Sequence, residues 1–335
     1  MTGKRTHSAM FVLLAMVVSL AVLAPAALAD KGPAPNEIGE IAYSYVDELT
    51  RITNSDGTYT KILRAAGTAG EIAAAEKVSG WLADAGYEPE MQPFTYVRRG
   101  VTYNSQNVVA FRNADLKRKA VPTPLVIVGA HYDAVTAGEG ADDNASGVAV
   151  MLELAERMAK FKIEYDLVFV AFGAEEAGLR GSRFFVESMD QSDVDRSIVM
   201  INFDSLIVGD LLYIHAGANE KTWARDEMLR LIRLHKLPIE IQPGLHPDYP
   251  AGLTPDGFSD YTAFNQVGIP IVAFESTNWE IGDLDGYEQT ESEGSFWHTP
   301  RDTLEVIEAL FPGRPMVRLN AYTTLTFEFL KHLNP

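Results

Sequence analysis

Three short apolar runs in the sequence are each followed by a side chain that can bind a metal. They are Leu125–Gly129 before His131, Asp166–Phe172 before Glu175 and Glu176, and Ser197–Phe203 before Asp204. Continuous apolar runs of this length are typical of strands covered on both faces, and segments with helical spacing alternate with them. We therefore predict a three-layer α/β/α fold with a central mixed, mostly parallel sheet. Its site would lie along the edge where the strands end.

Other elements follow from the spacing of apolar residues and from turn residues. We expect helices within 36–52, 68–85, 146–160, 182–188, 223–234, 303–310 and 315–333, and further strands at 91–98, 106–111, 211–215 and 269–274. The first two helices should cover the same face of the sheet. Thr68 with Glu71 resembles a capping box, and Asp302 with Glu305 can cap the helix that begins near Thr303.

Residues 1–29 resemble a secretion signal. A basic start precedes an apolar run from Met10 to Leu23, and Ala27-Leu28-Ala29 fits a signal-peptidase site. The run is shorter than the ~20 residues that comfortably span a membrane, so a retained anchor is the less favoured alternative. We expect cleavage of this signal peptide, a single domain over residues 30–335, and export to the periplasm or the medium.

The chain has no cysteine, which excludes disulfides, thiolate metal sites and thiol nucleophiles. Any metal ligands must therefore be His, Asp or Glu. The formal net charge is −18, and loss of the leader removes Lys4 and Arg5 but no acid, which makes it −20. Such a charge disfavours nucleic acid and anionic membrane surfaces as partners. We expect a monomer that, once the leader is removed, binds no membrane.

Six side chains are candidates for a metal site: His131, Asp143, Glu175, Glu176, Asp204 and His298. Singly, each has a plain explanation, such as a helix N-cap for Asp143 or the end of a strand for Asp204. Together they would place several acids in one crevice, where mutual repulsion raises their pKa values. A bound cation relieves that repulsion, so the combination predicts a metal site.

Several segments resemble the exported two-zinc aminopeptidases, a metallopeptidase family that includes the bacterial leucine aminopeptidases. They are His131-Tyr132-Asp133, Asp143-Asn144-Ala145-Ser146-Gly147, Glu175-Glu176 with Gly178, Asn202-Phe203-Asp204, Ser259-Asp260-Tyr261 with Gly268-Ile269-Pro270, and His298-Thr299-Pro300. Their spacing fits as well, with twelve positions from His131 to Asp143 and 29 from Glu175 to Asp204. The resemblance runs from about Thr68 to the C-terminus. It implies the zinc-dependent exopeptidase fold.

The resemblance implies two Zn²⁺ ions per chain and a role for each matching residue. Asp143 would bridge both ions, His131 and Asp204 would complete one site, and Glu176 and His298 would complete the other. Glu175 would be the catalytic general base, which takes a proton from water and passes it to the leaving amine.

The sequence suggests less definite roles for four further residues. Asp133 is expected to orient His131 through its second ring nitrogen. Asp142 competes with Asp143 for the bridging position, although the spacing favours Asp143. Asp260 either supports the site from behind or starts a helix. Trp297 stands where many relatives have a tyrosine; its indole N–H can donate but cannot titrate, which leaves the oxyanion contact open.

The remaining histidines lack metal-like neighbours in the sequence. His7 lies in the leader, and we interpret His215, His235, His246 and His332 as surface or helix-end residues.

The resemblance implies that the substrates are the N-termini of peptides or proteins. From Glu275 onward, the chain is most similar to the isozyme-conversion branch of the family, which removes arginine. We therefore consider a preference for a basic first residue, accepted by acids of the loop 278–295: Glu280, Asp283, Asp285, Glu288, Glu291 and Glu293. General surface charge is the alternative explanation for these acids.

Three other functions stay open on the same scaffold: a single-zinc glutaminyl cyclase, a non-catalytic binding module and a carboxypeptidase. The presence of all five ligands and Glu175 argues against the first two. The interval from Asp204 to His298 is too short and continuous for the inserted dimerisation domain that many such carboxypeptidases carry.

Overall fold

The structure is a computed structural model that describes residues 38–53, 59–116 and 122–333. They belong to one compact unit, Gly32–Pro335. The signal peptide expected over residues 1–29 lies outside the described residues and stays a prediction. In the ranges described, no helix combines the length and the apolar character needed to cross a membrane.

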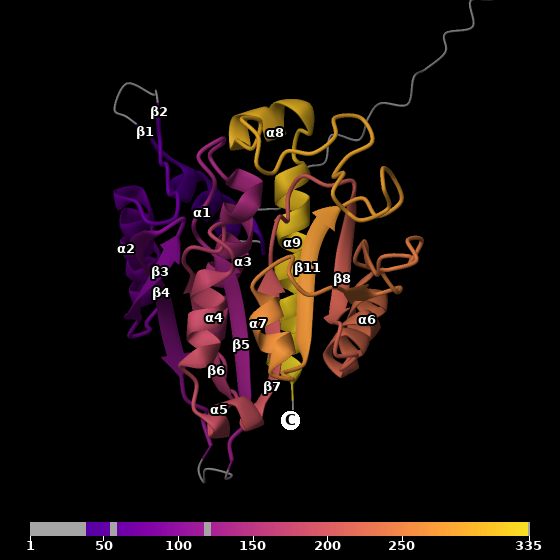
Figure 1. Cartoon of the computed structure of the whole chain (residues 1–335). Helices are drawn as coiled ribbons and strands as arrows, with labels where there is room; N and C mark the ends of the chain where they lie inside the picture. The colour runs from indigo at the N-terminus through magenta and orange to yellow at the C-terminus, as the bar shows by residue number, and fades with distance from the viewer. Residues whose placement is uncertain (1–37, 54–58, 117–121, 334–335) are drawn as a thin grey trace, which may run out of the picture. The chain divides into compact units, whose positions relative to one another are not determined.

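Within the described residues, nine strands form one mixed sheet (Figure 1). Across the sheet they are β10 (Leu253–Thr254), β8 (Leu211–Gly217), β11 (Ile271–Thr277), β7 (Ser197–Phe203), β5 (Leu125–His131), β6 (Asp166–Phe172), β4 (Val101–Arg112) and β3 (Glu90–Arg98), with β9 (Ile239–Glu240) paired to β8. The central strands β11, β7, β5 and β6 run parallel to one another. β8 and β4 flank them in the antiparallel direction. A separate antiparallel pair joins β1 (Arg51–Thr53) and β2 (Tyr59–Lys61).

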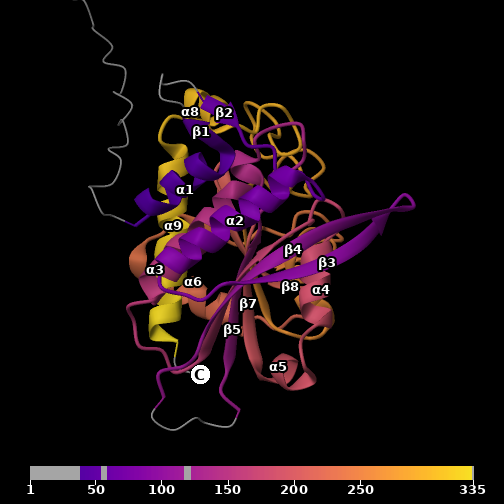
Figure 2. The same cartoon turned by 90° about the vertical axis from the view of Figure 1, so that its left-hand side faces the viewer.

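Helices cover both faces of this sheet, so the predicted three-layer arrangement is confirmed. One apolar core includes residues of α1 (Glu40–Thr50), α2 (Ala69–Asp84), α3 (Ser146–Met158), α6 (Trp223–His235), α8 (Leu304–Leu310) and α9 (Arg314–His332). The core on the other face includes α4 (Arg180–Glu187) and α7 (Tyr261–Gln266), with α5 (Gln191–Arg196) packed beside it. Figure 2 shows α1, α2, α3 and α9 on one side of the sheet, and α4 and α5 on the other.

The two cores explain the continuous apolar runs of the central strands. In β5, Val126 and Val128 enter the first core, whereas Leu125 and Ile127 enter the second. Successive side chains of a strand point to opposite faces. A strand that is covered on both faces therefore needs an apolar residue at every position.

Some local predictions were wrong. The short helix α5 was not predicted, and β11 covers Ile271–Thr277 where we expected 269–274. The helix α7 begins directly after Asp260, which was one of the two alternatives for that residue. Thr68 does cap α2, because its hydroxyl accepts a hydrogen bond from the Glu71 N–H. At α8 the cap is Thr303, which accepts from Val306, and Asp302 does not fill this role. Its carboxylate is engaged in a tertiary contact at the site.

Candidate metal centre and active site

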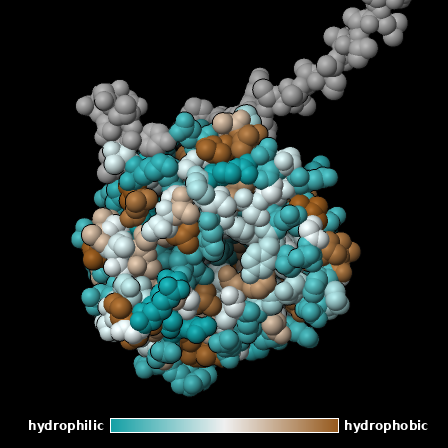
Figure 3. All heavy atoms as spheres, turned by 45° about the horizontal axis from the view of Figure 1, so that its top comes forward, coloured by the Kyte–Doolittle hydropathy of each residue, from teal (hydrophilic) through white to brown (hydrophobic). Residues whose placement is uncertain are grey.

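The parallel strands bring the candidate side chains to one edge of the sheet. β5 ends at His131, the loop after β6 carries Glu175 and Glu176, and Asp204 follows β7. β5 is in parallel register with both neighbours, with His131 opposite Phe172 of β6 and Gly129 opposite Asn202 of β7. The carboxyl ends of these strands therefore meet. Figure 3 shows a hollow in the face of the molecule that carries them.

Five of the predicted side chains form two donor groups that share Asp143. In the first, His131 Nε2 lies 3.2 Å from Asp143 Oδ1 and 3.4 Å from Asp204 Oδ1. In the second, His298 Nε2 lies 3.3 Å from Asp143 Oδ2 and 3.1 Å from Glu176 Oε2. Asp143 thus presents a different oxygen to each group. The ligand atoms of each group lie within 4.8 Å of one another.

The donor chemistry of both groups fits a divalent cation such as zinc. Each group offers one imidazole nitrogen and two carboxylate oxygens, and three protein ligands leave a position open for water or substrate. Among the described residues, Glu176 Oε1 is buried without a hydrogen-bond partner. A buried carboxylate oxygen of this kind needs a donor or a cation to offset its desolvation.

Charge in the site favours a cation as well. Hydrogen bonds to Asp143 and Glu176 raise the pKa of His298 to about 11. Burial lowers the pKa of His131, but neighbouring carboxylates, Asp204 foremost, outweigh burial and hold that pKa well above its ordinary value. The neighbouring carboxylates therefore favour a positive charge on both imidazoles. A metal ion that binds the same nitrogens would supply that charge in place of a proton.

Glu175 lines the same cavity but belongs to neither donor group. Burial raises the pKa of Glu175 well above its usual range; His131 opposes this shift, and Asp260 adds to it. A carboxylate with a raised pKa is a better proton acceptor. Asp260 itself is fully buried and directly precedes α7, but its side chain makes no capping hydrogen bond.

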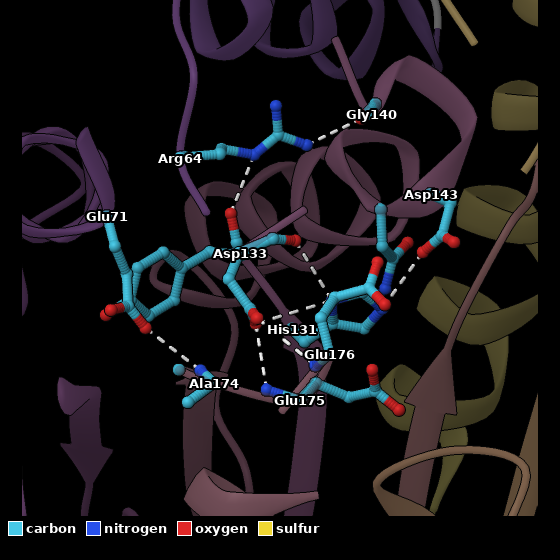
Figure 4. Close-up of polar contacts among 12 residues, drawn as sticks. Arg64, Glu71, His131, Asp133, Gly140, Asp143, Ala174, Glu175 and Glu176 are labelled. Carbon is cyan, nitrogen blue, oxygen red and sulfur yellow. Dashed lines mark hydrogen bonds and ion pairs between the residues drawn. The ribbon is translucent and has the colours of Figure 1, made fainter. Parts of the chain in front are cut away.

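Asp133 contacts the second ring nitrogen of His131, as expected, and its side chain has a further role. Its carboxylate accepts hydrogen bonds from the backbone N–H groups of Glu175, at 3.0 Å, and Glu176, at 3.2 Å (Figure 4). His131 Nδ1 lies 3.1 Å from the Asp133 carbonyl oxygen and 3.6 Å from its carboxylate. The residue predicted to orient His131 therefore does so through its backbone. Its side chain holds the loop of the two glutamates.

Asp142 points away from both donor groups, which removes it as a competitor for the bridging position. Its Oδ1 accepts from the N–H of Ile207 at 2.7 Å and of Val208 at 3.2 Å. Its Oδ2 accepts from the Gln289 side chain at 2.6 Å. Asp302 accepts from the N–H groups of Asp142 and Asp143.

Two further residues hold the site, and sequence analysis missed both roles. Arg64 is 1% exposed, and its guanidinium donates to the carbonyl oxygens of Tyr132, Glu139 and Gly140. It thereby ties the end of β5 to the loop before Asp143. No sequence pattern predicts this role of Arg64, because the residues whose carbonyl oxygens it contacts lie at least 68 positions away.

The second of these residues is Glu71. Its capping-box pattern predicted a hydrogen bond at the start of α2 and gave no sign of a contact with the loop that carries Glu175. Glu71 Oε1 accepts from the Ala174 N–H at 3.0 Å and from the Ser105 hydroxyl at 2.6 Å (Figure 4). Ala174 directly precedes Glu175 and has a φ of 53°, a left-handed conformation that is unusual for a residue with a side chain. The Glu71 carboxylate therefore stabilises the turn that presents Glu175.

The cavity continues beyond the donor groups, with a volume of about 380 Å³. Its lining includes the aromatic residues Phe258, Tyr287 and Trp297 and, besides Glu175, two acids outside the metal groups, Glu275 and Asp285. His215 lines it too. The interpretation of His215 as a surface residue was wrong, because it is 1% exposed on β8. The strand pattern of 211–215, in which the side chains alternate between two covered faces, was the available signal.

The model of peptidase family M28 matches residues 107–314. The chain belongs to this family and to the metallo-aminopeptidase class of hydrolases. It is 30% identical over 297 residues to the alkaline phosphatase isozyme conversion protein of Escherichia coli (strain K12), which covers 81% of this chain and 86% of that protein.

Two solved structures share the fold. A zinc aminopeptidase from Bacillus subtilis has a TM-score of 0.69 at 18% identity, with 90% of this chain and 98% of that chain covered. The glutaminyl cyclase of Porphyromonas gingivalis has a TM-score of 0.63 at 20% identity, with 89% and 99% covered. At these identities the likeness confirms the predicted exopeptidase fold, and it does not separate the two reactions.

Proposed function

We propose that this protein is an exported aminopeptidase that uses two zinc ions and Glu175 to remove the N-terminal residue of peptides or proteins. The observation that carries the proposal is the pair of donor groups joined by Asp143, with Glu175 on the same cavity wall. A single-zinc site would not require a second complete donor group. A binding module would not require Glu175.

His131, Asp204 and one Asp143 oxygen would hold one zinc, and Glu176, His298 and the other Asp143 oxygen would hold the second. Two zinc ions would supply an activated water and would stabilise the charge that develops on the scissile carbonyl oxygen.

Glu175 would accept the proton of the attacking water and deliver it to the departing amine. Three features support this role: its exposure to the cavity, its raised pKa and its absence from both donor groups. Asp133 and Glu71 would keep the backbone around it in place. Trp297 lines the cavity beside His298, so its indole is the candidate donor to the oxyanion.

The signal-like pattern of residues 1–29 supports export. The single-domain arrangement over residues 30–335 and the monomeric state are part of the same proposal. A preference for basic first residues also belongs here, since two acids besides Glu175 line the cavity outside the donor groups, Glu275 and Asp285. Only Asp285 of the six loop acids does so, so general surface charge explains the other five well enough.

The test is a metal count combined with a substrate assay. We expect elemental analysis of the purified protein to give two zinc ions per chain, and aminoacyl anilides to be hydrolysed in a chelator-sensitive reaction. Glu175→Gln should retain both metals and lose nearly all activity. One zinc with cyclisation of N-terminal glutamine would identify a glutaminyl cyclase instead, and neither metal nor turnover would indicate a binding module.

A further inference from the structure

Glu275 is an acid in the cavity that the metal site does not use. It lies on β11, which runs beside β7, and the Phe274 carbonyl just before it accepts a hydrogen bond from the Asp204 N–H at 3.1 Å. Glu275 thus stands on the strand next to a candidate zinc ligand. Its side chain is 21% exposed and lines the cavity.

One oxygen of this carboxylate has two close neighbours, of which the Trp279 indole makes a hydrogen bond. Trp279 Nε1–H donates to Oε1 at 2.6 Å, and His215 Nε2 lies 2.9 Å from the same oxygen. Both of these contacts of the carboxylate, which lie among the described residues, involve Oε1. The indole therefore orients the carboxylate, and the side chain lines the cavity, where a ligand can meet it.

Three aromatic rings line the cavity together with Glu275. Trp297 is adjacent in sequence to His298, the Tyr287 ring lies 6.3 Å from the Trp297 ring, and Phe258 lies 5.6 Å from Tyr287. All three rings line the cavity. Such a wall suits the apolar stem of an arginine or lysine side chain. Its ring faces can also attract the charged end.

Asp285 adds a second negative charge near Glu275. It directly precedes Gly286, whose φ of +79° would strain any other residue, and a Cβ at Gly286 would lie 2.6 Å from the Trp279 indole. The Asp285 turn therefore packs against the same indole that donates to Glu275. Among the described residues that line the cavity, none is Lys or Arg. With the metal-site acids counted as ligands and Glu175 as the general base, Glu275 and Asp285 remain as acids of the cavity wall, and His215 lies 2.9 Å from Glu275.

We propose that Glu275 is the specificity-determining residue of this cavity and binds the guanidinium or ammonium group of a basic first residue. Asp285 makes the electrostatic potential at this place more negative. The inference rests on the proposed aminopeptidase function and assigns its substrate class to one residue. A charge-assisted hydrogen bond to a pre-oriented carboxylate favours a cation over a neutral group of the same shape. The planar guanidinium can also stack on the aromatic wall, so arginine should exceed lysine.

The test compares substrates that differ in charge but not in shape. Anilides of arginine, its neutral isostere citrulline, lysine and leucine are assayed with the zinc-loaded protein and with its Glu275→Gln variant. We expect wild-type kcat/KM for arginine to exceed that for citrulline by about tenfold to a hundredfold, and Glu275→Gln to bring the ratio close to one. A zinc content equal to that of wild type would show that Glu275→Gln is folded, and the leucine rate of the same variant is the reference for its arginine rate.

A matched control and a second readout isolate the effect. Asp283→Asn removes the same charge from an exposed position of the loop and should leave the arginine-to-citrulline ratio unchanged. Asp285→Asn should lower it by a smaller factor than Glu275→Gln. Calorimetric titration of the free amino acids should give tighter binding of arginine than of citrulline in wild type, and equal binding in Glu275→Gln.

Two outcomes would overturn this assignment: equal hydrolysis of arginine and citrulline anilides by wild type, or an arginine preference that survives Glu275→Gln. Failure of the proposed function would look different, because the zinc-loaded wild type would then hydrolyse none of the four anilides, leucine included.

Discussion

Asp302 accepts a hydrogen bond from the backbone N–H of Asp143, with 3.1 Å between the Asp302 Oδ2 and the nitrogen, although 159 positions separate the two residues. Its Oδ1 accepts from the Asp142 N–H at 2.7 Å. In Asp302→Asn, an NH₂ group would face one of these N–H donors, and the loop of Asp143 would shift. We expect zinc affinity, measured by competition with a chelating dye, to fall by about tenfold to a hundredfold. Glu305→Gln, exposed on α8, is the control and should bind zinc like wild type.

Arg64 should be more important for stability than for chemistry. Replacement by methionine would leave three buried carbonyl oxygens, those of Tyr132, Glu139 and Gly140, without the donor that they use now. We expect the free energy of unfolding of the chelator-treated protein to fall by about 3 kcal/mol in urea denaturation. Arg230→Met, in which the replaced side chain is 56% exposed, should change it by less than about 0.5 kcal/mol. Equal losses in both variants would contradict the role of Arg64.

Glu71 should affect turnover through the position of Glu175. In Glu71→Gln, an amide NH₂ would face backbone N–H donors that the carboxylate now accepts from, and the turn at Ala174 would relax. We expect kcat to fall by about tenfold to a hundredfold, with KM and zinc content nearly unchanged. Glu76→Gln, at an exposed position of the same helix, is the control. A loss of bound zinc in Glu71→Gln would place the defect in the metal site instead.

Glu71 should also make stability depend on pH. Burial raises the pKa of Glu71 to about 7 from an ordinary value of 4.5. The folded protein therefore binds this proton more tightly than the unfolded chain, and the associated stability, present below pH 4.5, is lost as the pH rises to about 7. We expect the stability of wild type relative to Glu71→Gln to fall over this range by up to about 3 kcal/mol. Urea denaturation of the metal-free proteins at several pH values measures it, and a constant difference would refute the shift.

The central strands were predictable because burial on both faces leaves a local trace in the sequence. β6 and β7 have the predicted limits, Asp166–Phe172 and Ser197–Phe203. The parallel arrangement of such strands made it reasonable to expect that His131, Glu175 and Asp204 would meet. The structure does bring them together with Asp143, Glu176 and His298.

The layered α/β/α fold and the residues that meet at the ends of the strands could be predicted from sequence, because hydrophobic periodicity and the order of the motifs are local properties. The ligand atoms that these residues present, and the contacts that hold them, became known from the folded chain. The fold turned Asp142 toward Gln289, 147 positions away, and Asp302 toward the Asp143 loop. It also buried His215 beside Glu275. These contacts join residues whose spacing follows no repeat. Hydrogen bonds between distant segments depend on how the layers pack, and a local sequence pattern does not predict that packing.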